Sequence, residues 1–286
     1  MEQLLAIDNA DSVLFHSSEI SEKYKKMSKA HRMNLEKIDF TNLPEAIRVI
    51  NEWITKHTNG QMFNVIRELD ARINMALFSV FMRQITWVRS FNPTLTKKKP
   101  FYAGGKSMEV EMMKRYYIYN VTEAKFANFA FIPINHNHQQ AVIILPNEGF
   151  TLDDVFKHFK FIDLPIYYQK SSVSYLKLKI PKFTLLGSKD MVRTLKHFNV
   201  SLIFESNNKD FKDFAGENGF LKTFLQVVNV EVKEARTIYF SNTDDDAVMG
   251  GWKTDFICDR PFYFLIYDHN ARIVLLAASI KNPNAA

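Results

Sequence analysis

The chain has 286 residues, of which 47% are hydrophobic, and it carries a formal net charge of +6. This composition is typical of a globular protein and excludes an intrinsically disordered chain. The charge is too small to indicate a dedicated nucleic-acid binder, and no apolar run reaches the roughly 18 residues that a membrane-spanning helix needs. We therefore expect a folded protein without a nucleic-acid or membrane partner.

The N-terminus and the glycosylation sequons give opposite indications of the cellular compartment. The N-terminus, "MEQLLAIDNADSV", is acidic and lacks the apolar stretch of a signal peptide. Two sequons, at Asn120 and Asn199, favour a secreted glycoprotein, although the tripeptide is also common by chance. The single cysteine, Cys258, excludes an intrachain disulfide framework and leaves the redox compartment open.

Two helices are expected near the start of the chain. Residues 17–33 predict a helix with a basic outer face, whose apolar positions are Ile20, Tyr24 and Met27. Residues 41–60 give a clearer pattern. There Asn42 stands near the cap and Pro44 in the first turn, Ile47, Ile50 and Ile54 follow at helical spacing, and Gly60 follows the last turn.

Strand patterns dominate from residue 74 onward. Residues 74–88 are almost continuously apolar, as expected for a strand buried on both faces, and residues 108–121 alternate. Residues 130–145 predict a hairpin that turns at 136–139.

The second half mixes short helices with further strands. The expected helices are residues 151–159 and 188–198, and the expected strands are 174–183, a strand around Val230 and Val232, and a hairpin over 262–280. No internal repeat is found. The pattern predicts one α+β domain with a large mixed or antiparallel sheet, a second sheet packed on it, and surrounding helices.

Three groups of residues resemble parts of known chemical sites, but each lacks the rest of its site. His136 and His138 have metal-ligand spacing without a third ligand. The "GGKS" of 104–107 has Pro100 where a phosphate loop needs its first glycine, and the acids 244–246 lack the rest of a calcium loop. No nucleophile motif accompanies Ser, His and Asp. We expect no catalytic residue, cofactor or metal.

The basic outer face of the 17–33 helix allows two interpretations. It is either a solvated helix face or a site for a polyanion, of the heparin or nucleic-acid kind. The residues of the candidate polyanion site are Lys25, Lys26, Lys29 and Arg32.

Seven stretches resemble the serpin family of serine protease inhibitors, in the family's order, from about Ala10 to Pro283. "INEWITKHTNGQ" resembles the family's helix signature, and "ITWVRSFNPTLTKKKPF" the strand and segment that come later. The matching positions are Asn51, Trp53, Thr58, Gly60, Trp87, Phe91, Pro93, Thr96, Phe101, Val110, Met112, Met113, Leu145, Pro146, Pro181, Phe183, Asp259, Pro261, Phe262 and Pro283.

The resemblance implies a single serpin-like domain over residues 1–286 that lacks the family's first helices. Serpins are longer at the N-terminus, and "ADSVLF" already resembles a strand that normally follows several helices. An uncovered apolar face would be an aggregation hazard, so we expect a truncated gene model or a splice product.

The resemblance also places the family's reactive loop at residues 234–257. In inhibitory serpins a protease cleaves this loop, which then inserts as a new central strand and traps the enzyme. A gapless count places the cleaved bond between Gly250 and Gly251, so that Gly250 or nearby Met249 meets the protease pocket.

The hinge at the start of this loop departs from the family pattern. Glu234 and Thr237 keep their places, but Arg236 occupies a glycine position. Tyr239 and Phe240 stand in the family's run of small residues. Arg236 removes the backbone freedom of glycine, and the aromatic side chains need room inside a sheet.

Strand periodicity leads to the same expectation without the family. A strand that inserts centrally sends alternate residues into the core. One set of alternate residues contains Asp245, and the other contains Asp244 and Asp246. Burial of an unpaired carboxylate costs on the order of several kcal/mol or forces protonation.

Two functions follow as hypotheses. In the first, the protein has lost efficient protease trapping and acts by binding a protein or a heparin-like polyanion through its loop or basic helix. The alternative is an active suicide-substrate inhibitor of a serine protease, cleaved near Gly250–Gly251. A third interpretation is an unstable remnant. The resemblance further implies an extracellular monomer that is not an enzyme.

Overall fold

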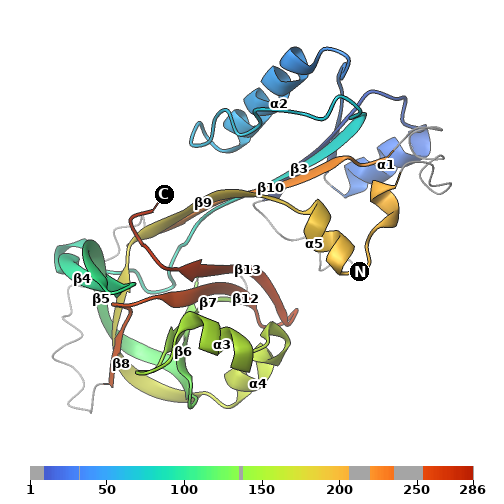
Figure 1. Ribbon diagram of the computed structural model, residues 1–286. Coiled ribbons are helices and arrows are strands. Elements are labelled where there is room, and N and C mark those ends of the chain that lie inside the picture. The colour runs from blue at the N-terminus through green and yellow to red at the C-terminus, as the bar shows by residue number, and fades with distance from the viewer. Residues whose placement is uncertain (1–9, 32, 135–137, 206–219, 235–253, 286) are drawn as a thin grey trace. The chain divides into compact units, whose positions relative to one another are not determined.

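The computed structural model describes residues 10–31, 33–134, 138–205, 220–234 and 254–285 (Figure 1). The chain forms two compact units. Unit 1 consists of Met1–Arg83 and Leu186–Val230, and unit 2 of Gln84–Leu185 and Glu231–Ala286. Both contain strands and helices, which agrees with the α+β prediction.

Unit 1 is built on a five-stranded sheet with the strand order β2-β1-β3-β10-β9. Strand β1 pairs in parallel with β2 and antiparallel with β3, so the sheet is mixed. The strands are β1 (Ala10–His16), β2 (Met33–Lys37), β3 (Met75–Gln84), β9 (Phe183–Asp190) and β10 (Thr223–Val232). The helices of this unit are α1 (Glu22–Ala30), α2 (Leu43–His57) and α5 (Val192–His197).

Helix α2 packs its apolar stripe on one face of this sheet. Phe15 of β1 meets Trp53 of α2 edge-on at 6.4 Å between ring centroids and meets Phe78 of β3 at 5.8 Å. The helix begins as the sequence predicts, because Asn42 accepts a hydrogen bond from the Glu45 N–H and Pro44 lies in the first turn. Burial of these large side chains is the main force that holds α2 in place.

Asn51 explains part of the helix signature. It is buried, its amide donates to the Ile66 carbonyl at 2.8 Å, and its carbonyl accepts from the Ile66 N–H at 2.9 Å. Thr58, fully buried at the end of α2, donates to the Ile54 carbonyl at 2.8 Å. These polar residues tie the long connection after α2 back onto the helix.

Unit 2 is built on an eight-stranded sheet with the order β11-β8-β5-β6-β7-β12-β13, and β4 pairs with β5 beside this path. The strands are β4 (Lys97–Ala103), β5 (Lys106–Glu123), β6 (Ala127–Pro133), β7 (Gln139–Pro146), β8 (Ser172–Pro181), β11 (Thr254–Ile257), β12 (Phe262–Asp268) and β13 (Ile273–Ile280). The helices of this unit are α3 (Leu152–His158) and α4 (Leu164–Gln169). It also contains two short 3₁₀ turns, η2 (Pro93–Leu95) and η3 (Phe161–Asp163), and unit 1 contains a third, η4 (Leu202–Phe204).

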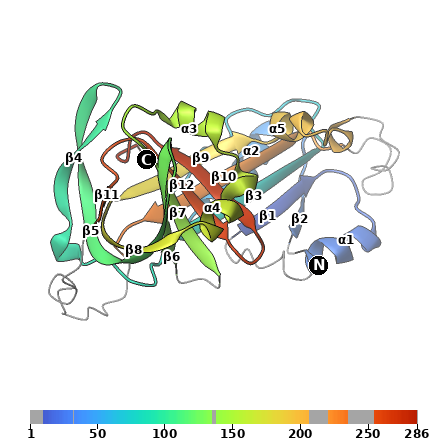
Figure 2. The ribbon, with the colours of Figure 1, turned by 90° about the horizontal axis from the view of Figure 1, so that it is seen from below.

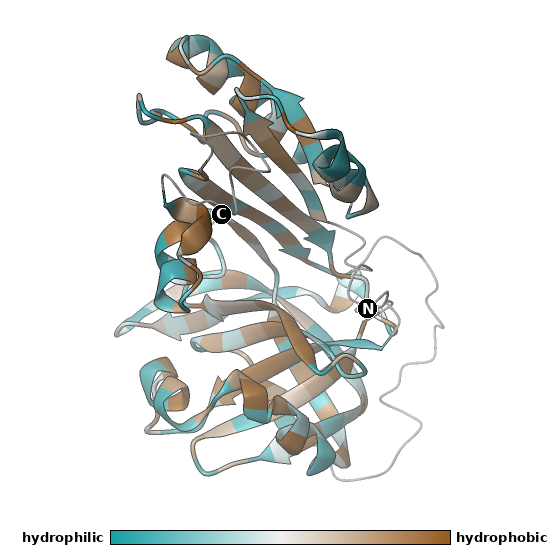
Figure 3. Ribbon diagram, turned by 90° about the vertical axis from the view of Figure 1, so that its right-hand side faces the viewer, coloured by the Kyte–Doolittle hydropathy of each residue, from teal (hydrophilic) through white to brown (hydrophobic). Residues whose placement is uncertain are grey.

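The core of unit 2 is rich in aromatic residues. Phe129, Phe131, Val142 and Ile144 of β6 and β7 belong to one buried cluster with Phe159, which follows α3. Figure 3 shows that apolar residues are concentrated along the strands, as the alternating and continuous apolar patterns predicted. Both predicted hairpins are confirmed, since β6 pairs antiparallel with β7 and β12 with β13.

Three local expectations differ from the structure. The helix predicted over 188–198 begins only at Val192, because β9 continues to Asp190 and the Asp190 carboxylate accepts from the Val192 N–H at 2.9 Å. Met27 of α1 is 47% exposed, and the buried position is Ser28, whose hydroxyl donates to the Tyr24 carbonyl. The long apolar strand ends at Gln84.

Candidate functional site

The loop-like segment has a described anchor at each end, and both anchors belong to unit 2. Glu234 follows β10 at the first end, and β11 forms the second end, so the last four residues of the predicted 234–257 segment are a strand. The remaining loop positions singled out from the sequence lie outside the described residues: Arg236, Thr237, Tyr239, Phe240, Met249, Gly250 and Gly251.

The Glu234 carboxylate is held by two partners from distant parts of the sequence. The Thr96 hydroxyl donates to Oε1 at 2.7 Å, and Lys182 Nζ lies 3.5 Å from Oε2. The residue is 9% exposed. Lys182 in turn lies 3.2 Å from Glu111 Oε2, so its charge is shared between two carboxylates.

The backbone around Glu234 is fixed as well. The Trp87 indole N–H donates to the Lys233 carbonyl at 2.7 Å, and the Phe91 N–H donates to the Glu234 carbonyl at 3.3 Å. Trp87 and Phe91 are buried and meet edge-on at 5.3 Å. We call Trp87, Phe91, Thr96, Lys182 and Glu234 the anchor cluster.

The electrostatics of the anchor cluster favour charged forms of both partners. Burial opposes ionisation of Glu234, but hydrogen bonds from Thr96 and the backbone and the nearby Lys182 outweigh it and lower its pKa. Burial likewise opposes the charge on Lys182, yet Glu111 and Glu234 together raise its pKa. The pair is therefore ionised across the neutral pH range.

The second anchor is a short parallel strand pair. Strand β11 pairs with β8, with Phe256 opposite Leu178 and Ile257 opposite Lys179. Phe256 is 3% exposed, and Asp255 forms an ion pair with Lys177 at 3.0 Å.

The structure describes partners for both ends of the predicted loop segment, Glu234 and β11. In unit 1, β10 neighbours β3 directly, so the sheet holds no strand between them. Insertion of the loop between these two strands would need their pairing to be broken and remade on both sides.

The lysines of the candidate polyanion site lie on α1. Lys25, Lys26 and Lys29 are exposed, and Arg32 lies outside the described residues. Lys25 forms an ion pair with Glu22 at 2.8 Å, which raises the pKa of Lys25 and partly neutralises the helix face.

The two sequons have different environments. Asn199 is exposed in a turn after α5, with a positive φ of 62°. Asn120 is half-buried in the central strand β5, where it pairs with Phe131 on one side and Val173 on the other. Its sequon partner Thr122 is buried and donates to the Tyr167 carbonyl at 2.6 Å. A glycan therefore has more room at Asn199.

The other candidate groups have local structural roles. Gly104 and Gly105, both with positive φ, form the two-residue turn between β4 and β5, which accounts for the "GGKS" stretch without a phosphate. His138 accepts through its carbonyl a hydrogen bond from the His269 N–H, and His136 lies outside the described residues. Among the residues that the structure describes, no three His, Cys, Asp or Glu gather as metal ligands. None of the described helices is long and apolar enough to cross a membrane.

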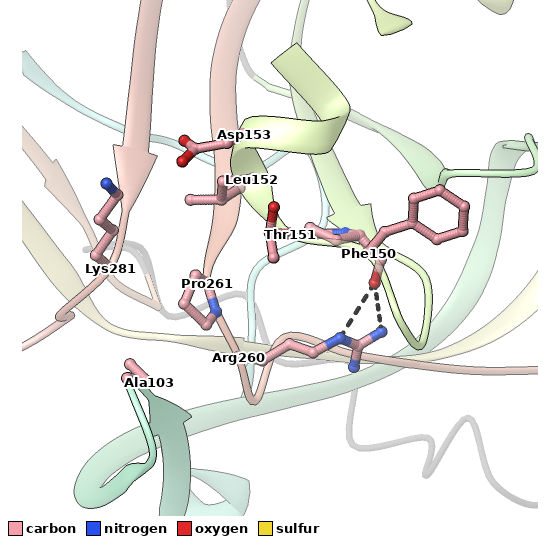
Figure 4. A pocket seen from close by; sticks show the side chains of 10 residues that line it. Ala103, Phe150, Thr151, Leu152, Asp153, Arg260, Pro261 and Lys281 are labelled. Carbon is pink, nitrogen blue, oxygen red and sulfur yellow. Dashed lines mark hydrogen bonds between the residues drawn. The ribbon is translucent and has the colours of Figure 1, made fainter. Parts of the chain in front are cut away.

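A pocket of about 520 Å³ lies between β4, β7, α3 and the start of β12 (Figure 4). Its walls include Phe150, Leu152 and Pro261. Arg260 at its edge already donates through Nε and Nη2 to the Pro146 carbonyl, at 3.1 and 2.8 Å. None of the site residues predicted from the sequence lines this pocket.

Comparison with solved structures defines the class of fold. A native protease nexin-1 structure with heparin superimposes with a TM-score of 0.84 at 23% identity, over 96% of this chain and 77% of that one. Uncleaved ovalbumin superimposes with a TM-score of 0.83 at 20% identity, over 96% and 74%. The described residues thus have the serpin fold.

Sequence comparison then places the chain in a family. A family model described as "Serpin (serine protease inhibitor)" matches residues 5–283, so the chain belongs to the serpin family. Glia-derived nexin of Rattus norvegicus is 25% identical over 260 residues, which are 87% of this chain and 66% of that protein. Plasminogen activator inhibitor 1 of Bos taurus is 22% identical over 262 residues, which are 88% of this chain and 65% of that protein. Serpin A12 of Homo sapiens is 27% identical over 249 residues, which are 86% of this chain and 59% of that protein. The chain spans just under two thirds of the length of the first two relatives.

Sequence reasoning found Glu234 but missed its partners. Trp87 and Thr96 were noted as family matches without a role, and Lys182 was not noted at all. Their separation from Glu234 along the chain hides the contact from sequence reasoning.

Proposed function

We propose that this serpin-family protein keeps the scaffold of a serine protease inhibitor but does not complete loop insertion, and that it acts by binding. The observation that carries the proposal is the combination of a firmly anchored Glu234 with the residues that follow it. Arg236, Tyr239 and Phe240 replace the glycine and small residues that insertion needs. The protein is then not an enzyme and traps proteases weakly at most.

The packing of the unit 1 sheet supports the proposal. On one face, Phe78, Val80 and Val227 are buried against α2. On the other face, Leu14 and Met75 are buried in a second cluster. A strand inserted between β3 and β10 would be enclosed on both sides, where Tyr239 or Phe240 overpacks the sheet and the acids at 244–246 lose water.

The partner class follows from charge and from relatives. The formal net charge is +6, and one solved relative is native protease nexin-1 in complex with heparin. A heparin-like polyanion or a protein that contacts the exposed loop suits this surface, with the protein acting outside the cell as a monomer. Glycosylation at the exposed Asn199 agrees with that location.

The test is a thermal melt before and after the 240–251 loop is nicked by a nonspecific protease. We expect an unchanged Tm, because the loop does not insert. Insertion as a new strand would instead add several kcal/mol of stability, and a rise of roughly 10 °C or more would overturn the proposal.

The alternative function is active inhibition, with cleavage near Gly250–Gly251 and Met249 or Gly250 in the protease pocket. It is favoured by the family, and β3 and β10 are paired directly, with no strand inserted between them. A complex with a serine protease that survives denaturing electrophoresis would support this function over the first.

A further inference from the structure

One face of the unit 2 sheet collects lysines from three neighbouring strands. In strand register, Lys114 of β5 stands directly opposite Lys179 of β8, and Lys177 stands opposite Tyr116. Lys99 of β4 lies on the same face, since it pairs with Val110 of β5. We call Lys99, Lys114, Lys177 and Lys179 the lysine face. Figure 2 shows β4, β5, β8 and β11 side by side at one end of this sheet.

This face has a shortage of counter-charge. Among the described residues, Lys177 pairs with Asp255 at 3.0 Å, whereas Lys99, Lys114 and Lys179 form no ion pair. By contrast, Lys98, which points to the other face of β4, lies 3.0 Å from Glu109. Like charges directly opposite each other across two strands destabilise a sheet. The repulsion is tolerated here without an internal partner.

The strand register places the ammonium groups close enough to repel one another. Burial lowers the pKa of Lys179, and the charges of Lys177, Lys99 and Lys114 lower it further, against the opposing effect of Asp255. An anion that lay among these groups would remove the repulsion. The face therefore gains more from an anionic ligand than an isolated lysine does.

The composition of the face selects the class of ligand. Protein interfaces are depleted in lysine, so a cluster made of lysines alone is a poor protein-docking surface. Single-stranded nucleic acid needs open aromatic faces on which bases stack, but Lys114 Nζ covers the Tyr116 ring at 4.8 Å. The lysine ammonium is a point charge and lacks the planar fork of arginine, so it imposes no fixed orientation on its partner. Such a group suits repeated sulfates on a flexible chain.

We propose that the lysine face binds a linear sulfated polysaccharide that crosses β4, β5 and β8. This inference rests on the proposed function as a binding protein and names the site of its polyanion. It differs from the sequence prediction, which placed that site on α1. Along β8 the lysines are two residues apart, about 6.6 Å, and neighbouring strands are about 4.8 Å apart, so adjacent anionic groups can be met together.

The test compares two triple variants of equal charge. The full chain, K99Q/K114Q/K179Q and K25Q/K26Q/K29Q are titrated with a fluorescent heparin oligosaccharide at several NaCl concentrations. We expect Kd to rise at least about tenfold for the face variant, with the salt slope reduced by about 2, and to change less than about twofold for the helix variant. The melting temperature of the face variant should not fall, because the substitutions remove repulsion.

Several outcomes overturn the inference. The first three are an equal or larger loss of heparin affinity in the helix variant, unchanged heparin affinity in the face variant, and no heparin binding by the full chain. The fourth is binding of single-stranded DNA of matched charge that is as tight as heparin binding and depends on the same lysines. None of them bears on loop insertion. The nicking experiment tests the proposed function separately.

Discussion

At the scale of single residues, Glu234 is held firmly at the start of the predicted loop segment. Its carboxylate is almost fully buried and meets one hydroxyl and one ammonium. Removal of the charge leaves Lys182 with one fewer partner in a partly buried position. The anchor is thus a charge-assisted contact rather than a simple hydrogen bond.

We expect Glu234→Gln to lower the free energy of unfolding by about 1 to 2 kcal/mol at pH 7. Urea titration at several pH values measures it. The folded pKa of Glu234 lies below its ordinary 4.5, so its stabilisation is present above pH 4.5 and is lost as pH falls through the folded pKa. The difference between wild type and variant should therefore shrink in acid.

Glu109→Gln is the matched control. Glu109 pairs with Lys98 at 3.0 Å, but its side chain is 62% exposed, so we expect a change near zero. An equal loss in both variants would contradict the role assigned to the anchor cluster.

The resemblance singled out Glu234 as a hinge residue but not the side chains that it touches. Glu234 could be placed by its distance from Pro261 and by the resemblance to a hinge. Thr96 and Lys182 come from other parts of the chain, and only the folded unit brings them to the carboxylate. A single sequence contains no signal for such long-range pairs.

At the scale of elements, periodicity predicted most strands and helices, and local polar contacts decided their ends. The hairpin of β6 and β7 and helix α2 have their expected places because apolar periodicity and caps agree. The predicted start of α5 at residue 188 was wrong, because the Asp190 side chain forms a turn after β9 and the helix begins only at Val192. Side-chain hydrogen bonds of this kind compete with helix formation.

The connection after α2 gives a prediction at this scale. Asn51→Ala removes both hydrogen bonds to the Ile66 backbone and leaves that buried N–H and C=O unpaired. We expect a loss of about 2 to 4 kcal/mol in the free energy of unfolding, measured by urea titration. Glu52→Ala on the same helix, where the Glu52 side chain is 64% exposed and paired with Arg48, should lose less than about 0.5 kcal/mol. Comparable losses would show that Asn51 is not a tether.

At the scale of the whole molecule, the question is whether β3 and β10 can separate to admit a further strand between them. The scaffold is that of the serpin family, and β3 and β10 are direct neighbours in the unit 1 sheet. What departs from the family is the sequence of the hinge. Under the proposed function, a few hinge residues rather than the fold decide whether the loop inserts.

Reversal of the hinge should restore insertion. We expect Arg236→Gly with Tyr239→Ala and Phe240→Ala to raise the Tm after nicking by roughly 10 °C, because small residues relieve the overpacking and glycine frees the backbone. Differential scanning calorimetry on intact and nicked protein measures it. Val248→Ala with Met249→Ala and Trp252→Ala changes the same loop beyond the hinge and serves as the control. If the reverted protein gains no stability on nicking, the acids at 244–246 are the stronger barrier.

Cys258 follows β11 directly and is fully buried, and its N–H donates to the Lys179 carbonyl at 2.9 Å. Burial raises the pKa of its thiol, so the group is neither ionised nor accessible in the paired state. It is also the only thiol in the chain. The rate at which Cys258 is alkylated therefore reports how often β11, the edge strand at the end of the loop segment, separates from β8. The measurement needs no introduced label.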